Sequence, residues 1–118
     1  MSPDTILVLS DDPLSAALLG AATELAGYAP RFPLPAEPVR AALRRVRPRL
    51  VLVDCNHAEA CTDEFVGPAL MTGSRVLLFR SRRTTSDPGE FAQRLGLRVL
   101  DLPVDHEPLS RLLREMLD

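Results

Sequence analysis

The sequence predicts an α/β fold, a doubly wound five-stranded parallel sheet with helices on both faces. Three short runs of consecutive apolar residues, at 6–9, 50–53 and 76–79, are typical of strands buried on both sides. Segments with apolar residues at helical spacing separate these runs. The resulting alternation of strand and helix repeats five times, which is the pattern of a parallel sheet with right-handed crossovers.

The predicted strands differ in how strongly the sequence marks them. The three apolar runs give the clearest signals, whereas residues 28–32 give a weaker one and end at the proline-rich segment 33–35. In chain order, the strands are predicted at residues 6–9, 28–32, 50–53, 76–79 and 97–102.

Capping residues set the ends of the predicted helices. Asp12 is an N-cap with Pro13 in the first helical position, and Gly27 stops the same helix. Asp87 begins a similar cap, and Pro68 is expected to interrupt or shorten the third helix. The helices are predicted at residues 13–25, 39–46, 63–71, 88–95 and 106–117.

Composition bounds the classes of function. The chain has 118 residues and a net charge of −2, with 4% aromatic residues, so it lacks the basic, aromatic surface of a nucleic-acid binder. We expect one domain over residues 1–118, no contact with nucleic acid and no membrane span. The N-terminus carries no signal-peptide pattern, and two cysteines fit a reducing cytosol, which predicts a cytoplasmic location.

Acidic residues follow two of the strongest strands. Asp11 and Asp12 come after the first run and Asp54 after the third predicted strand, so all three are expected at one edge of the sheet. Like charges so close repel unless a cation or protons intervene, and carboxylates suit Mg²⁺, with the carbonyl of Asn56 as a further oxygen. Asp54 would then be a nucleophile toward a phosphoryl group. A structural role is the alternative, since Asp12 before Pro13 is also a good helix cap.

The segments 6–12 and 50–56 resemble the receiver domain of two-component response regulators, the CheY-like family, and the similarity extends from residue 6 to residue 117. The resemblance implies the flavodoxin-like strand order 2-1-3-4-5. It implies that Asp11 and Asp12 bind Mg²⁺, that Asp54 is the phosphoacceptor and that the backbone of Asn56 ligates the ion. It also implies a homodimer through the fourth helix, fifth strand and fifth helix.

The chain departs from the family at three positions. Arg80 stands where receivers have a threonine or serine that contacts the phosphoryl group, with Ser81 one residue later. Leu102 stands where they have a lysine before proline, and no realignment restores it because all 14 basic residues are arginine. Val99 replaces an aromatic residue. Arg80 could hold the phosphate bidentately, pair with Asp54 or be solvated.

The sequence therefore predicts an atypical receiver module that is not an enzyme. It would act in phosphorelay signalling by contact with a histidine kinase or a downstream protein, with weak, absent or altered phosphorylation at Asp54. One alternative is a functional Mg²⁺-dependent phosphoacceptor in which Arg80 compensates for the missing lysine. Another is a small Mg²⁺-dependent phosphohydrolase or phosphotransferase.

Two other groups of residues are weaker candidates for functional sites. Cys55, His57 and Cys61 lack a fourth soft ligand and a zinc spacing, so Cys55 is expected to be a small apolar core residue. The arginines of the second helix form a basic outer face, which is either solvated or a docking surface for an acidic protein. They are Arg40, Arg44, Arg45 and Arg47.

Overall fold

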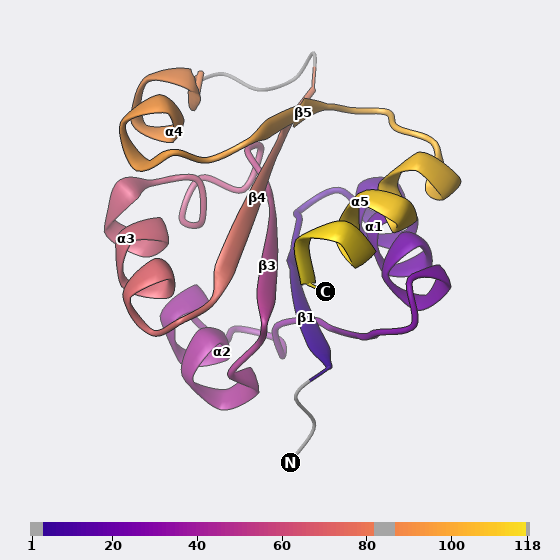
Figure 1. Ribbon diagram of the computed structural model, residues 1–118. Helices are drawn as coiled ribbons and strands as arrows, with labels where there is room; N and C mark the ends of the chain where they lie inside the picture. Colours follow the sequence, from indigo (N-terminus) through magenta and orange to yellow (C-terminus); the bar gives the residue numbers. More distant parts are fainter. Residues whose placement is uncertain (1–3, 82–86, 118) are drawn as a thin grey trace.

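The computed structural model describes residues 4–81 and 87–117, and it consists of one parallel sheet between two layers of helices (Figure 1). Strands and helices alternate along the chain, as predicted. They are β1 (Thr5–Leu9), α1 (Pro13–Leu25), β2 (Ala29–Arg31), α2 (Val39–Val46), β3 (Leu50–Asp54), α3 (Asp63–Met71), β4 (Arg75–Arg80), α4 (Gly89–Leu95), β5 (Val99–Asp101) and α5 (His106–Leu117).

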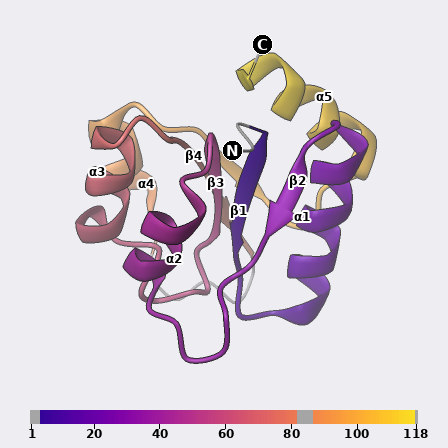
Figure 2. The same cartoon turned by 90° about the horizontal axis from the view of Figure 1, so that it is seen from below.

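The strand order is β2-β1-β3-β4-β5, and every neighbouring pair is parallel. Helices α1 and α5 cover one face of the sheet, and α2, α3 and α4 cover the other (Figures 1 and 2). Both the predicted fold class and the strand order implied by the resemblance are confirmed.

Alternate residues of the central strands pack into two separate cores, because successive side chains of a strand point to opposite faces. In β1, Leu7 and Leu9 pack beneath α2, α3 and α4, whereas Ile6 and Val8 pack beneath α1 and α5. All four are fully buried, as a strand covered on both faces requires. The unbroken apolar runs in the sequence are thus explained by two helical layers.

The edge strands are shorter than predicted. The second strand covers three residues instead of five, and the fifth covers Val99–Asp101 instead of 97–102. Each pairs with one neighbour only, so fewer backbone hydrogen bonds extend it.

The interruption predicted in α3 is wrong, because the helix continues through Pro68 to Met71. Proline has no N–H, so the carbonyl of Glu64, four residues earlier, lacks its usual helical donor. The guanidinium of Arg40 donates to that oxygen at 2.8 Å. A neighbouring helix thus supplies the hydrogen bond that the proline removes.

No helix within residues 4–81 and 87–117 is long and apolar enough to cross a membrane. Residues 1–3, part of the N-terminus in which the sequence shows no signal-peptide pattern, lie outside the described residues.

Candidate functional site

Asp54 is the last residue of β3, and its side chain lies at the centre of the carboxyl edge of the sheet. It is fully buried. The hydroxyl of Ser10 donates to its Oδ2 at 2.8 Å, and the backbone N–H of Asn56 donates to its Oδ1 at 3.1 Å. Both carboxylate oxygens are therefore engaged by hydrogen-bond donors from the protein.

Asp12 caps α1, as its position before Pro13 also predicted. Its Oδ1 accepts from the N–H of Leu14 at 3.2 Å, and its Oδ2 accepts from the hydroxyl of Ser15 at 3.0 Å. A carboxylate at this place satisfies N–H groups that the helix leaves without partners. Both oxygens of Asp12 are thus used within the first turn of α1.

Asp11 is the most exposed of the three acids, with 67% of its side chain accessible. One of its oxygens lies 3.7 Å from Nε2 of His57, in the segment that follows β3. The side chain of Asp11 thus lies beside the segment that follows β3.

The segment after β3 connects the site to the next strand. The side-chain amide of Asn56 donates to the hydroxyl oxygen of Ser81 at 3.1 Å, just beyond β4. Two buried atoms here, Oδ1 of Asn56 and Nδ1 of His57, have no hydrogen-bond partner in the part of the chain that the structure describes. Burying a polar atom without a partner costs free energy, so this segment is held in an unfavourable position.

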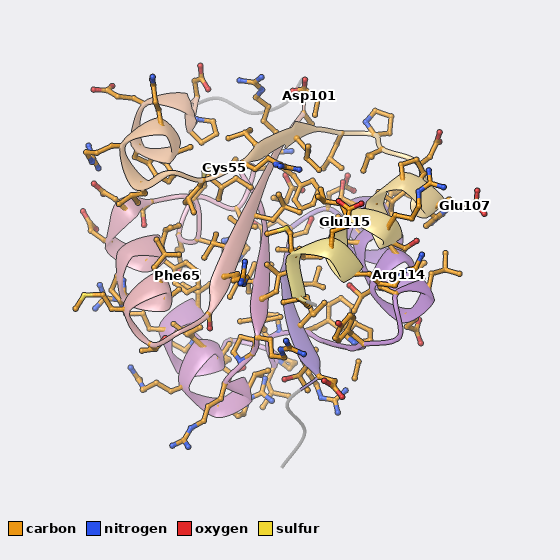
Figure 3. The ribbon with its side chains drawn as sticks, viewed as in Figure 1. Cys55, Phe65, Asp101, Glu107, Arg114 and Glu115 are labelled. Carbon is orange, nitrogen blue, oxygen red and sulfur yellow. A yellow bond between two sulfur atoms is a disulfide. The ribbon has the colours of Figure 1, made fainter. Side chains whose placement is uncertain are left out.

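Arg80 lies at the end of β4, but its guanidinium binds carboxylates other than Asp54. Its Nε donates to Asp101 at 2.8 Å and a terminal nitrogen donates to Asp87 at 3.3 Å. The hydrogen bond to Asp101 is the largest cause of a raised pKa of Arg80. Figure 3 shows Asp101 at the upper end of the sheet, beyond Cys55.

Leu102, where the resemblance implies a lysine, lines a pocket instead of presenting a charge. The pocket has a volume of about 500 Å³ and lies between α1 and the segment after β5, with Asp12 and Ser81 on its wall. The N–H of Leu102 donates to the carbonyl of Arg80 at 2.7 Å, and the peptide bond to Pro103 is cis. Among the residues that the structure describes, the wall of this pocket carries the negative charge of Asp12 and no cationic side chain.

These side chains do not fit a Mg²⁺ site as they are arranged. No group of three or more His, Cys, Asp or Glu side chains among the described residues could hold a metal ion together. The reason is local: Asp12 is used as a helix cap, Asp11 turns outward to His57, and the oxygens of buried Asp54 accept from Ser10 and Asn56.

The two cysteines form a disulfide, so the expectation of reduced thiols is wrong in this structure. Cys55 is 4% exposed and packs in the core beneath α2, α3 and α4, which agrees with its predicted burial. The turn between the cysteines brings their Cα atoms to 4.9 Å, within the range that a disulfide needs.

Two residues of the site were not predicted from the sequence to touch the acids. Ser10 is the donor to Asp54, and His57 is the neighbour of Asp11. Ser10 carried a signal that could have been used, since it is the first polar residue after the buried run of β1 and therefore stands at the carboxyl edge.

No protein-family model matches the sequence, and no curated protein matches it either. Solved structures with the same fold do match. A response regulator from Thermotoga maritima superposes with a TM-score of 0.74 at 14% identity, over 99% of this chain and 98% of that one.

Two further structures agree with it. A CheY-like response regulator receiver domain protein from Methanospirillum hungatei has a TM-score of 0.71 at 22% identity, over 99% of this chain and 95% of that one. A response regulator receiver protein from Burkholderia phymatum has a TM-score of 0.63 at 17% identity, over 96% and 94%. The chain therefore has the fold of the response regulator receiver domains, and its likeness to them extends over nearly its whole length.

Proposed function

We propose that the chain is an atypical receiver module of a two-component signalling protein, which acts by protein contacts and not as an enzyme. One observation carries the proposal: a buried aspartate, Asp54, ends the central strand of a receiver-type sheet and is held there by Ser10 and Asn56. In the family that the chain resembles, the residue at this place accepts the phosphoryl group.

The geometry around Asp54 supports weak or absent phosphorylation. A carboxylate oxygen must reach the phosphorus of a donor, but Asp54 is fully buried and both its oxygens already accept hydrogen bonds. The charge that develops on a transferring phosphoryl group needs fixed positive partners. Leu102, which stands where the family has a lysine, is uncharged and provides no such partner.

The same geometry favours this form over a receiver in which Arg80 compensates for the lysine. The guanidinium of Arg80 would have to leave Asp101 and Asp87 to reach a phosphoryl group on Asp54.

The partners follow from the proposed class of protein. We propose a histidine kinase or a downstream signalling protein, a cytoplasmic location, and self-association through α4, β5 and α5. The homodimer stays a prediction. Measuring the sedimentation coefficient over a range of protein concentrations tests it.

The test is phosphoryl transfer from acetyl phosphate in the presence of Mg²⁺, followed by intact mass and peptide mapping. Asp54→Asn is the control for the acceptor, and beryllofluoride with Mg²⁺ tests for a conformational change by sedimentation. We expect labelling well below one phosphoryl group per chain and little change in shape.

Two outcomes would contradict the proposal. Stoichiometric labelling of Asp54 with a large conformational change would support the working phosphoacceptor instead. Continuous release of phosphate from a phosphorylated substrate, lost in Asp54→Asn, would support a phosphohydrolase.

A further inference from the structure

The disulfide between Cys55 and Cys61 encloses two residues that form hydrogen bonds with the candidate phosphoacceptor, Asn56 and His57. Cys55 directly follows Asp54, and the segment 55–61 is called the cysteine loop here. The N–H of His57 donates to the carbonyl of Asp54 at 2.8 Å, and the N–H of Asn56 donates to its carboxylate at 3.1 Å. The position of this loop therefore decides whether Asp54 keeps its hydrogen bonds with Asn56 and His57.

Two buried polar atoms of the cysteine loop favour its opening. Oδ1 of Asn56 and Nδ1 of His57 are buried without partners in the described part of the chain, and water would hydrate both atoms if the loop moved outward. The covalent bond between its two ends restricts such a movement, since a closed ring has fewer open conformations than a free segment. Cutting the bond removes that restriction, while the cost of the unpaired atoms stays.

The two cysteines differ in exposure. Cys55 is 4% exposed, whereas Cys61 is half-buried. Cys61 also lines a cavity of about 390 Å³ between the first turns of α3 and α4, beside Thr62 and Phe91. Cys61 is therefore the cysteine that is more open to a thiolate from outside.

We propose that Cys55–Cys61 is a site of thiol–disulfide exchange with a dithiol, and that its reduction releases the cysteine loop from Asp54. A thiolate of the dithiol attacks Sγ of Cys61, and Cys55 leaves as a thiolate that takes up a proton. The second thiol of the dithiol then displaces Cys61 from the mixed disulfide. The protein gains two electrons and two protons, and the dithiol becomes a cyclic disulfide.

The inference rests on the proposed function for its consequence at Asp54 and on the proposed cytoplasmic location for the presence of a reducing thiol pool. In the cytoplasm a protein disulfide is usually transient, catalytic or redox-sensing, because the thiol pool keeps cysteines reduced. The state of the disulfide beside Asp54 would then make the reactivity of Asp54 depend on the redox state of the cytoplasm.

The test is hydrogen exchange of the full chain, oxidised and after treatment with dithiothreitol. On reduction, we expect amides of the cysteine loop to exchange at least about tenfold faster, as local opening allows, while β1 stays protected. Cys61→Ser should exchange like the reduced protein in both conditions, and Cys55→Ala serves as a second variant if Cys61→Ser does not fold. Equal exchange in the oxidised and reduced protein would overturn the proposal, as would a response to dithiothreitol in a folded single-cysteine variant.

Labelling by acetyl phosphate separates this inference from the proposed function. We expect Asp54 to be labelled faster in the reduced protein, because the donor from Asn56 is released. Stoichiometric labelling of the oxidised protein would contradict the proposed function and leave the exchange result standing. Unchanged exchange in the loop would contradict the redox site alone. Asp54→Asn should keep the redox response of the loop, since the disulfide does not depend on the acceptor.

Discussion

The hydroxyl of Ser10 donates a 2.8 Å hydrogen bond to Oδ2 of Asp54 and so joins the carboxyl ends of β1 and β3. The N–H of Asp12 donates in turn to the oxygen of Ser10 at 3.2 Å, where the chain turns into α1. A fully buried carboxylate needs such donors to offset its lost hydration. Ser10 therefore stabilises Asp54 in place and at the same time occupies an oxygen that phosphoryl transfer would need.

Ser10→Ala is expected to lower the free energy of unfolding by about 1.5–3 kcal/mol, the range for a hydrogen bond to a charged group. In an Asp54→Asn background the same change should cost only about 0.5–1.5 kcal/mol, because the bond is then between neutral groups. Urea denaturation of the four proteins measures the difference. Equal costs in both backgrounds would show that the charge of Asp54 is not what Ser10 stabilises.

Arg40→Gln is expected to destabilise the protein through the carbonyl of Glu64. Arg40 donates to this oxygen, for which Pro68 has no N–H to offer. Without Arg40 only water can bond the carbonyl, and the free energy of unfolding should fall by about 0.5–1.5 kcal/mol. In a Pro68→Ala background the new N–H bonds the carbonyl within the helix, and Arg40→Gln should cost clearly less. A double-mutant cycle in urea gives the coupling, and additive effects would contradict this role of Arg40.

The ion pair between Glu37 and Arg45 predicts a dependence on pH. A 2.8 Å hydrogen bond from Arg45, helped by the N–H of Leu34, lowers the pKa of Glu37 from 4.5 to about 2. Because the folded-state pKa is lowered, the pair contributes stability above pH 4.5, and the contribution is lost as the pH falls toward 2.

Arg45→Gln should raise the pKa of Glu37 toward its ordinary value, which the chemical shift of its carboxyl carbon measures during an acid titration. The stability difference from the wild type should shrink as the pH falls through the same interval. Arg44→Gln is the matched control, since no ion pair is found for Arg44 in residues 4–81 and 87–117. An equal pKa of Glu37 in the two variants would rule out this cause.

The fold was predictable because the strongest signals belong to its most buried parts. The runs 6–9, 50–53 and 76–79 became β1, β3 and β4, the three inner strands, whose apolar residues have to face two cores. The edge strands were harder to delimit, because β2 contains Pro30 and the half-exposed edge tolerates polar residues such as Arg31. Strand order came from the family resemblance, since no local pattern encodes which strands are neighbours.

The site was less predictable, because its contacts join distant parts of the chain. Ser10 and Asp54 are 44 residues apart, and a neutral hydroxyl has no charge pattern to mark it. Asp12 had two possible roles, and the structure uses its carboxylate as a helix cap, which is a local interaction. The disulfide depends on the turn from His57 to Cys61, which the spacing of the cysteines alone does not reveal.

Leu102→Lys is expected to restore part of the phosphoacceptor chemistry. Leu102 lines the same pocket as Asp12 and Ser81, so a lysine there would bring an ammonium group toward the carboxyl edge while its methylene groups keep the apolar contacts. A fixed positive charge near the transferring phosphoryl group should raise the rate of labelling of Asp54 by acetyl phosphate about tenfold or more.

Leu102→Met controls for the change of shape, because methionine is a flexible, uncharged side chain of similar size. Leu102→Lys combined with Asp54→Asn controls for labelling elsewhere. The rate is measured by intact mass over time at equal protein and Mg²⁺ concentrations. If Leu102→Lys labels no faster than Leu102→Met, the missing ammonium does not limit the reaction, and the burial of Asp54 beneath Ser10 and the cysteine loop becomes the better explanation of its low reactivity.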